Sequence, residues 1–259
     1  MGLSYRPVAV DLLAPFRVAP TASAILLDVD GTLAPIVAHP DLSRVPPATL
    51  DVLKRLADRF ALVACVSGRS AHDAKRLVPV EGVHFVGNHG LETLEGDILR
   101  YAAGVDTWLP IVNSTARAIE PIAATLGTWV EDKGATFSVH LREAPDPDAA
   151  RSVLVARAVP LIIAAGLGWR MGRMTLEVRP PINHDKGTAI AALLASHPSV
   201  RHSLYAGDDS TDLDAFEVVD VSIAVRSDEA PAELTEAAQI VVDGPFGLIG
   251  VLNSLAESA

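Results

Sequence analysis

The stretch AILLDVDGTL at residues 24–33 decides the fold of this chain. Apolar residues followed at once by Asp28, Asp30 and Gly31 predict a strand that is buried on both faces and ends in a turn, as in a parallel sheet covered by helices. Ligands bind beyond the carboxyl ends of such strands, so the two carboxylates lie where a reaction centre is expected. They repel each other unless a divalent cation or a phosphoryl group lies between them. An ordinary Asp-Gly turn is the alternative.

The composition is that of a globular protein. The 259 residues are 49% hydrophobic and 20% charged, which suits one large domain or two modest ones. The net charge of −11 argues against a nucleic-acid surface and an anionic membrane, and no window is apolar enough for a membrane span. The single cysteine, Cys65, lies in an apolar run, which predicts a buried strand residue and a reducing compartment. We therefore expect a cytoplasmic protein with no nucleic-acid or membrane partner.

Strand and helix patterns alternate through most of the chain, which predicts an α/β fold. Strands are predicted at 60–66, 83–86, 203–206, 221–225 and 239–242, and helices at 48–59, 71–77, 189–195, 231–238 and 246–256. The first 20 residues are expected to form an arm with a short helix near 8–13. The catalytic core, a parallel sheet with helices on both faces, is assigned to residues 1–104 and 183–259.

Residues 105–182 follow a different pattern. A helix is predicted at 107–126, interrupted by Pro121, then strands at 128–132 and 136–141, a helix at 146–165, and strands at 168–171 and 174–178. This order predicts a self-contained α+β unit of two similar halves inserted into the core.

Three further polar segments lie at the ends of predicted core elements. Ser67-Gly68-Arg69 follows a strand, Lys186 precedes a helix, and the acidic run 208–212 follows another strand. Several oxygen ligands within five residues favour a hard cation at the acidic run. Simpler interpretations exist for the first two segments, namely a turn next to a helix cap at Ser70 and a solvated surface lysine.

In this order the segments resemble the motifs of the haloacid dehalogenase superfamily. The resemblance implies an HAD-like Rossmannoid core in which Asp28 is the nucleophile, Asp30 is the acid/base, and Ser67 and Lys186 hold and neutralise a phosphoryl group. It also implies Mg²⁺ as the cofactor, with metal ligands drawn from Asp28, Asp30, Asp208, Asp209 and Asp212.

The inserted unit carries pairs of polar residues spaced two apart. These pairs are Glu131 with Lys133, His140 with Arg142, and Glu177 with Arg179. Members of a pair share one face of a strand. Exposed cross-strand ion pairs are the simpler explanation for them. Upstream, the run 87–90, Gly-Asn-His-Gly, indicates either a backbone pressed near a ligand or a tight hairpin.

These pairs, the run that begins at Gly87 and the acidic run together closely resemble trehalose-6-phosphate phosphatases over about residues 24–250. The resemblance implies hydrolysis of trehalose 6-phosphate through an aspartyl-phosphate, with the inserted unit as a C2-type cap that determines the substrate. Val29 and Leu141 depart from the tyrosines expected in many relatives. The implied substrate-binding residues are Gly31, Thr32, Gly68, Arg69, Asn88, His89, Glu131, Lys133, His140, Arg142, Glu177 and Arg179.

Two alternatives remain at this stage. One is a phosphatase for another sugar or glycosyl phosphate, such as sucrose phosphate, and the other is a non-catalytic sugar-phosphate sensor. A sensor should lack an essential acid, whereas Asp28, Asp30 and Asp208 are all present here. The expected partners are a small-molecule sugar phosphate and, functionally, a trehalose-6-phosphate synthase. We expect a monomer.

Overall fold

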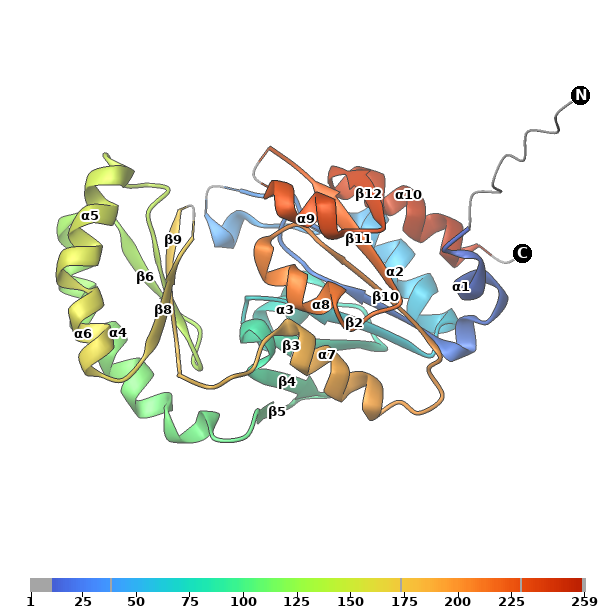
Figure 1. Ribbon diagram of the computed structural model, residues 1–259, viewed down its shortest axis with the longest axis horizontal. Helices are drawn as coiled ribbons and strands as arrows, with labels where there is room; N and C mark the ends of the chain where they lie inside the picture. The colour runs from blue at the N-terminus through green and yellow to red at the C-terminus, as the bar shows by residue number, and fades with distance from the viewer. Residues whose placement is uncertain (1–10, 38, 173, 229, 258–259) are drawn as a thin grey trace, which may run out of the picture.

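The computed structural model describes residues 11–37, 39–172, 174–228 and 230–257. An eight-stranded sheet with helices on both faces lies beside a four-stranded sheet with helices on its outer face (Figure 1). The α/β fold class predicted from the sequence is therefore confirmed. No helix in the described ranges has the length and hydropathy to cross a bilayer.

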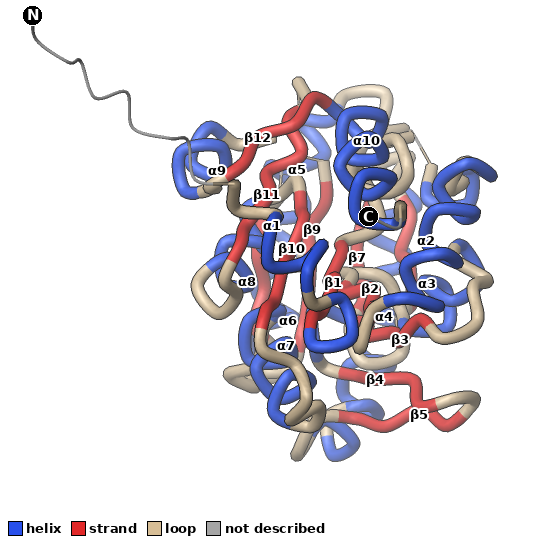
Figure 2. Tube along the Cα trace, turned by 90° about the vertical axis from the view of Figure 1, so that its right-hand side faces the viewer, coloured by secondary structure: helices blue, strands red, loops and turns tan. Residues whose placement is uncertain are grey.

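The large sheet has the strand order β12-β11-β10-β1-β2-β3-β4-β5, which Figure 2 shows from one end of the molecule to the other. Its parallel strands are β1 Ser23–Leu27, β2 Leu62–Val66, β3 Val83–Gly87, β10 His202–Gly207, β11 Val221–Arg226 and β12 Ile240–Asp243. The antiparallel edge strands are β4 Glu92–Glu95 and β5 Ile98–Tyr101. The chain runs from β1 to β2 and β3 on one side and later fills β10 to β12 on the other. The strand order thus reverses between β1 and β10, where open α/β sheets bind their ligands.

Helices cover both faces of the large sheet (Figure 2). One layer contains α1 Ala14–Val18, α2 Pro47–Arg59, α3 Ala71–Leu77 and α10 Gly244–Ala256, and the other contains α7 Lys186–Ala195 and α8 Leu213–Phe216, while α9 Ala232–Ala237 packs near β11. On β1, Ile25 and Leu27 pack into the first layer and Ala24 and Leu26 into the second, and all four are fully buried. The apolar run of β1 therefore holds both layers together and ends at Asp28.

The small antiparallel sheet has the order β6-β7-β9-β8. Its strands are β6 Trp129–Asp132, β7 Phe137–His140, β8 Gly168–Met171 and β9 Thr175–Arg179, and its helices are α4 Leu109–Thr125, α5 Pro147–Arg157 and α6 Val159–Ala164. Phe137, Val139, Leu176 and Val178 are fully buried against these helices. Residues that alternate with them point away from the helices, toward the large sheet.

Short 3₁₀ helices complete the described chain: Pro20–Ala22, Pro40–Leu42, Asn88–Gly90, Val105–Thr107 and Ser210–Asp212. Cys65 is buried in β2, as predicted. The domain boundaries at 104/105 and 182/183 remain predictions.

Several element predictions were wrong. The helix predicted over 146–165 is two helices that break at Ala158, because Pro160 lacks the N–H that a continuous helix needs there. Pro121 does not interrupt α4 and lies on its exposed side. The helix predicted near 8–13 lies partly outside the described residues, and α1 begins only at Ala14.

Candidate active site

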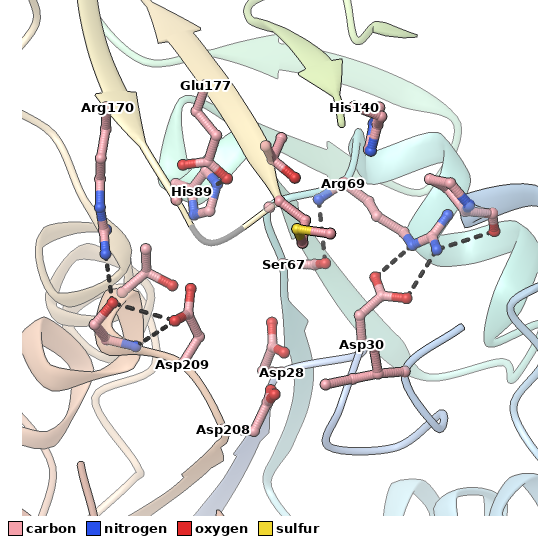
Figure 3. A pocket seen from close by; sticks show the side chains of 18 of the residues that line it. Asp28, Asp30, Ser67, Arg69, His89, His140, Arg170, Glu177, Asp208 and Asp209 are labelled. Carbon is pink, nitrogen blue, oxygen red and sulfur yellow. Dashed lines mark hydrogen bonds and ion pairs between the residues drawn. The ribbon is translucent and has the colours of Figure 1, made fainter. Parts of the chain in front are cut away.

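A cavity of about 520 Å³ lies between the carboxyl end of the large sheet and the small sheet (Figure 3). Asp28, Ser67 and Asp208 line its floor, just beyond the ends of β1, β2 and β10 respectively. Because β1 is hydrogen-bonded to both β2 and β10, these side chains are brought together by the strand order alone.

Lys186 forms an ion pair with Asp28. Its Nζ lies 2.8 Å from Asp28 Oδ1 and 2.5 Å from Asp212 Oδ1, and the lysine is 2% exposed. The prediction of a solvated surface lysine is therefore excluded. The side chain of Asp185 caps α7 through Thr188, so the helix begins at Lys186 rather than at residue 189.

Asp208 lies against the turn that follows β1. The hydroxyl of Thr32, which is fully buried, donates a hydrogen bond to Asp208 Oδ1 over 3.2 Å. A Cβ atom added to Gly31 would lie only 1.9 Å from Asp208 Oδ2, and the φ of Gly31 is +79°. Gly31 and Thr32 were predicted to bind substrate, but neither lines the cavity, and both act on the position of Asp208.

Both oxygens of the Asp212 carboxylate accept two hydrogen bonds each. Oδ1 accepts from Lys186 and from the Tyr205 hydroxyl at 2.6 Å, and Oδ2 accepts from the backbone N–H groups of Asp208 and Asp209, both at 2.9 Å. Asp212 is fully buried. It is therefore placed to orient Lys186 and the 208–209 backbone, and its role as a metal ligand remains a prediction.

Asp28, Asp208 and Asp212 have carboxylate oxygens within 4.8 Å of one another, and they are the acidic group with this geometry among the described residues. Lys186 supplies one positive charge against three carboxylates. Burial raises the pKa of Asp28 to about 7, although Lys186 opposes that shift, and burial together with Asp28 raises the pKa of Asp208. Uncompensated negative charge on hard oxygen donors fits a divalent cation held by Asp28 and Asp208.

Asp30 is not part of this acidic group. Its carboxylate forms a two-point ion pair with Arg69, at 2.5 and 2.8 Å (Figure 3). It also accepts from the Ser43 hydroxyl at 3.0 Å. The carboxylate of Asp209 accepts instead from Ser210 at the start of a 3₁₀ helix. Other donors thus engage both carboxylates, and the roles of Asp30 and Asp209 at the metal site remain predictions.

The loop after β2 forms another part of the cavity wall. Ser67 is 1% exposed, and its Oγ accepts from the backbone N–H of Arg69 at 3.2 Å. Gly68 lies against the ring of His89, and a Cβ on Gly68 would lie 2.6 Å from that ring. Ser67, predicted to be catalytic, and Gly68, Arg69 and His89, predicted to bind substrate, all line the cavity.

Asn88 was predicted to bind substrate but does not line the cavity. It is fully buried, its Nδ2 donates to the Lys133 carbonyl at 2.9 Å, and its Oδ1 accepts from Thr136 at 2.5 Å. Asn88 and His89 are the non-glycine residues with positive φ in the described chain, at +50° and +55°. Asn88 thus ties the turn between β6 and β7 to the core, and these contacts hold the unusual backbone in place.

The opposite wall of the cavity is the polar face of the small sheet. The strand register aligns Glu131, Ser138, Glu177 and Arg170 in one row across all four strands. In the next row on this face, His140 is opposite Trp129 and Thr175. Of the substrate-binding residues predicted in this unit, the cavity lining includes Glu131, Lys133, His140, Arg142 and Glu177. It does not include Arg179.

Both glutamates of this wall are held in the ionised form. Burial alone would raise their pKa values, but the hydrogen bond with His140 at 2.7 Å and the charge of Lys133 lower the pKa of Glu131 to about 2. His89, with Nε2 at 3.8 Å, and Lys133 likewise lower the pKa of Glu177. Ionised carboxylates on rigid strands are strong acceptors for hydroxyl groups.

Arg179 is the fourth predicted substrate-binding residue that does not line the cavity, after Gly31, Thr32 and Asn88. Its guanidinium donates to the His184 carbonyl, and the residue lines a smaller neighbouring cavity of about 310 Å³. Sequence reasoning missed Arg170, whose guanidinium reaches the Ser210 hydroxyl across the cavity (Figure 3). The signal was its position opposite Glu177, which becomes visible only once the register of β8 and β9 is known.

Residues 26–237 match the family model described as trehalose-phosphatase. The chain is 31% identical over 243 residues to the trehalose-phosphate phosphatase of Mycobacterium tuberculosis (90% of this chain, 61% of that protein) and 32% identical over 210 residues to trehalose-phosphate phosphatase B of Arabidopsis thaliana (75% and 55%). It spans 18% to 61% of the length of the curated relatives it matches.

Solved structures share this fold. A trehalose-6-phosphate phosphatase related protein aligns with a TM-score of 0.78 at 25% identity, covering 90% of this chain and 96% of the other. A haloacid dehalogenase-like hydrolase from Bacteroides thetaiotaomicron aligns with a TM-score of 0.63 at 15% identity, covering 90% and 99%. The second likeness shows the fold alone.

Proposed function

Because the chain belongs to the trehalose-phosphatase family, we propose that it hydrolyses trehalose 6-phosphate to trehalose and inorganic phosphate with Mg²⁺ as cofactor. One observation carries this proposal: the buried Asp28–Lys186 pair and Asp208 form the floor of a cavity whose opposite wall is a polar sheet face. The floor offers charge for phosphoryl transfer, and the wall offers hydrogen-bonding groups for a sugar.

In the proposed reaction, an Asp28 carboxylate oxygen bonds to phosphorus while the bond from phosphorus to the sugar oxygen breaks. Asp30, which takes up a proton from water after it leaves the Arg69 guanidinium, gives that proton to the sugar oxygen. Asp30 then takes a proton from water, whose oxygen bonds to phosphorus as the bond to Asp28 breaks. The products are trehalose, inorganic phosphate and the free Asp28 carboxylate.

Other residues of the floor hold the phosphoryl group in this scheme. Lys186 neutralises charge on Asp28 and the phosphate, while the Ser67 hydroxyl and the Gly68 backbone N–H donate to phosphoryl oxygens. When bound at Asp28 and Asp208, Mg²⁺ supplies further positive charge against the repulsion between phosphate and carboxylate. Asp30 must exchange the Arg69 guanidinium for the substrate before it can transfer a proton.

We propose residues 105–182 as the cap that selects the sugar. Glu131 and Glu177 accept hydrogen bonds from sugar hydroxyls, and Lys133 donates to such hydroxyls. The two glutamates are ionised and half-buried, on β6 and β9 with β7 between them. A trehalose-6-phosphate synthase, as the source of the substrate, and a monomeric state are part of this proposal.

The test is release of inorganic phosphate from trehalose 6-phosphate beside sucrose 6-phosphate, hexose phosphates and nucleotides, in Mg²⁺ and in EDTA. Asp28→Asn is the inactive variant, and Asp97→Asn, at a side chain 96% exposed, is its matched control. We expect a strong preference for trehalose 6-phosphate that is lost in EDTA and in Asp28→Asn but not in Asp97→Asn.

Two results would count against the proposal in different ways. Metal-dependent hydrolysis of another sugar phosphate would keep the chemistry of the floor and refute the role given to the cap. Absence of hydrolysis across the whole panel would refute the enzymatic proposal and favour a sugar-phosphate sensor.

A further inference from the structure

Tyr205 carries a hydroxyl group into an apolar layer of the core. It lies on β10, is fully buried, and packs with Ala24, Leu26 and Ile190 between the large sheet and α7. A buried hydroxyl without a partner destabilises a protein, whereas phenylalanine would fill the same space without needing a partner. The hydroxyl therefore calls for an explanation beyond packing.

The hydroxyl has a partner in Asp212, 2.6 Å away at Oδ1. The same oxygen accepts from Lys186 Nζ at 2.5 Å, and Lys186 in turn donates to Asp28 at 2.8 Å. All four side chains are at least nine-tenths buried. A continuous chain of hydrogen bonds thus runs from Tyr205 to the proposed nucleophile.

The other oxygen of Asp212 is already held by two backbone N–H groups. Gly207 packs directly against this carboxylate, since a Cβ there would lie 2.2 Å from Asp212 Cγ. The hydrogen bonds of the Asp212 carboxylate can therefore change only at Oδ1, which accepts from both Tyr205 and Lys186. Loss of the hydroxyl would leave Oδ1 entirely to Lys186 and draw the ammonium away from Asp28.

We propose that Tyr205 is a positioning residue whose hydroxyl, acting through Asp212, holds the Lys186 ammonium on Asp28. The proposal rests on the phosphatase function proposed above. It deepens that function by extending the active site one residue into the core, to a side chain that does not line the cavity.

If Tyr205 only packed the core, loss of its ring contact would matter and loss of its hydroxyl would not change kcat. Its ring packs against that of Phe216, with centroids 6.1 Å apart and planes at 68°. Tyr205→Phe keeps this contact and removes only the hydroxyl. Phe216→Leu is the matched control, because it disturbs the ring contact and keeps the hydroxyl.

The experiment measures kcat and KM for trehalose 6-phosphate in Mg²⁺ for both variants, together with their thermal unfolding. We expect Tyr205→Phe to lower kcat about 5- to 30-fold with KM within about twofold, since the sugar-facing wall is untouched. Phe216→Leu should lower Tm and leave kcat within about twofold. An unchanged kcat in Tyr205→Phe, or an equal loss in Phe216→Leu, would overturn the proposal.

A crystal structure of Tyr205→Phe gives a readout that needs no substrate. We expect the Lys186 Nζ to Asp28 Oδ1 distance to exceed the present 2.8 Å by an amount that breaks the hydrogen bond. If the wild-type chain hydrolyses no sugar phosphate, the proposed function fails, and this structure still decides the role of Tyr205. An unmoved Lys186 would overturn it.

Discussion

Substitution of Gly31 by alanine should separate backbone strain from active-site geometry. The new Cβ would lie 1.9 Å from Asp208 Oδ2, whereas real Cβ contacts stay beyond 3.0 Å, so the carboxylate has to retreat by about 1 Å. Asp208 is buried beside Asp28, and that retreat moves it away from the proposed metal position. A displacement of this size costs about 100-fold in rate.

The matched control is Gly96→Ala in the turn between β4 and β5. Gly96 has a φ of +63°, similar to the +79° of Gly31, but a Cβ added there would have nothing within 4 Å. Both variants should therefore lose about 1–2 kcal/mol in free energy of unfolding from the left-handed backbone. Only Gly31→Ala adds a contact with a side chain of the proposed metal site, that of Asp208.

The assay is phosphate release from trehalose 6-phosphate across a Mg²⁺ titration, with urea unfolding of each variant. We expect Gly96→Ala to keep wild-type kcat and Gly31→Ala to lose about 100-fold with a raised Mg²⁺ requirement. If the two variants retain similar activity, the placement of Asp208 by the Gly31 turn is not what the reaction depends on, and the reasoning is refuted.

Three further predictions concern charge, anchoring and sugar binding. Burial raises the pKa of Asp28 from 3.8 to about 7 in the folded state, so the folded state binds this proton more tightly than the unfolded state does. In EDTA, the free energy of unfolding should therefore fall as the pH rises from about 4 to 7. Added Mg²⁺ should accordingly raise Tm more at pH 8 than at pH 5 in calorimetry, and equal increases would contradict this. Asn88→Ala removes the contacts with Lys133 and Thr136 and should lower the free energy of unfolding by about 2–4 kcal/mol in urea; a loss below about 0.5 kcal/mol would show that the contacts do not anchor the turn. Glu131→Gln should raise KM for trehalose 6-phosphate about 10-fold with kcat nearly unchanged, and a loss confined to kcat would refute a role in sugar binding.

The floor of the site was largely predictable from the sequence. Apolar runs that end abruptly in polar residues mark the carboxyl ends of buried strands, and parallel strands bring those ends to one edge of the sheet. This reasoning identified Asp28, Ser67 and Asp208, all of which line the cavity. The same pattern predicted the α/β fold.

The directions of individual side chains were not predictable in this way. Asp30 lies two residues after Asp28, and Asp209 lies next to Asp208, but in a turn the backbone conformation decides where a side chain points. Asn88 contacts residues about 45 positions further along the chain, and no local pattern encodes that contact. Arg170 needed the strand register. By contrast, the break at Ala158 was readable from Pro160 and was overlooked.

Neighbouring residues on the strands of the small sheet have different tasks: those on one face maintain stability and those on the other face line the cavity. Phe137, Val139, Leu176 and Val178 face the helices and carry the hydrophobic core of the unit, so most changes there would unfold it. Of the residues that alternate with them, His140, Thr175 and Glu177 line the cavity and do not belong to that core. With the proposed role of the cap, point mutations on the cavity side of β6, β7 and β9 would change which phosphate ester a lineage accepts, while the unit that carries those residues keeps its stability.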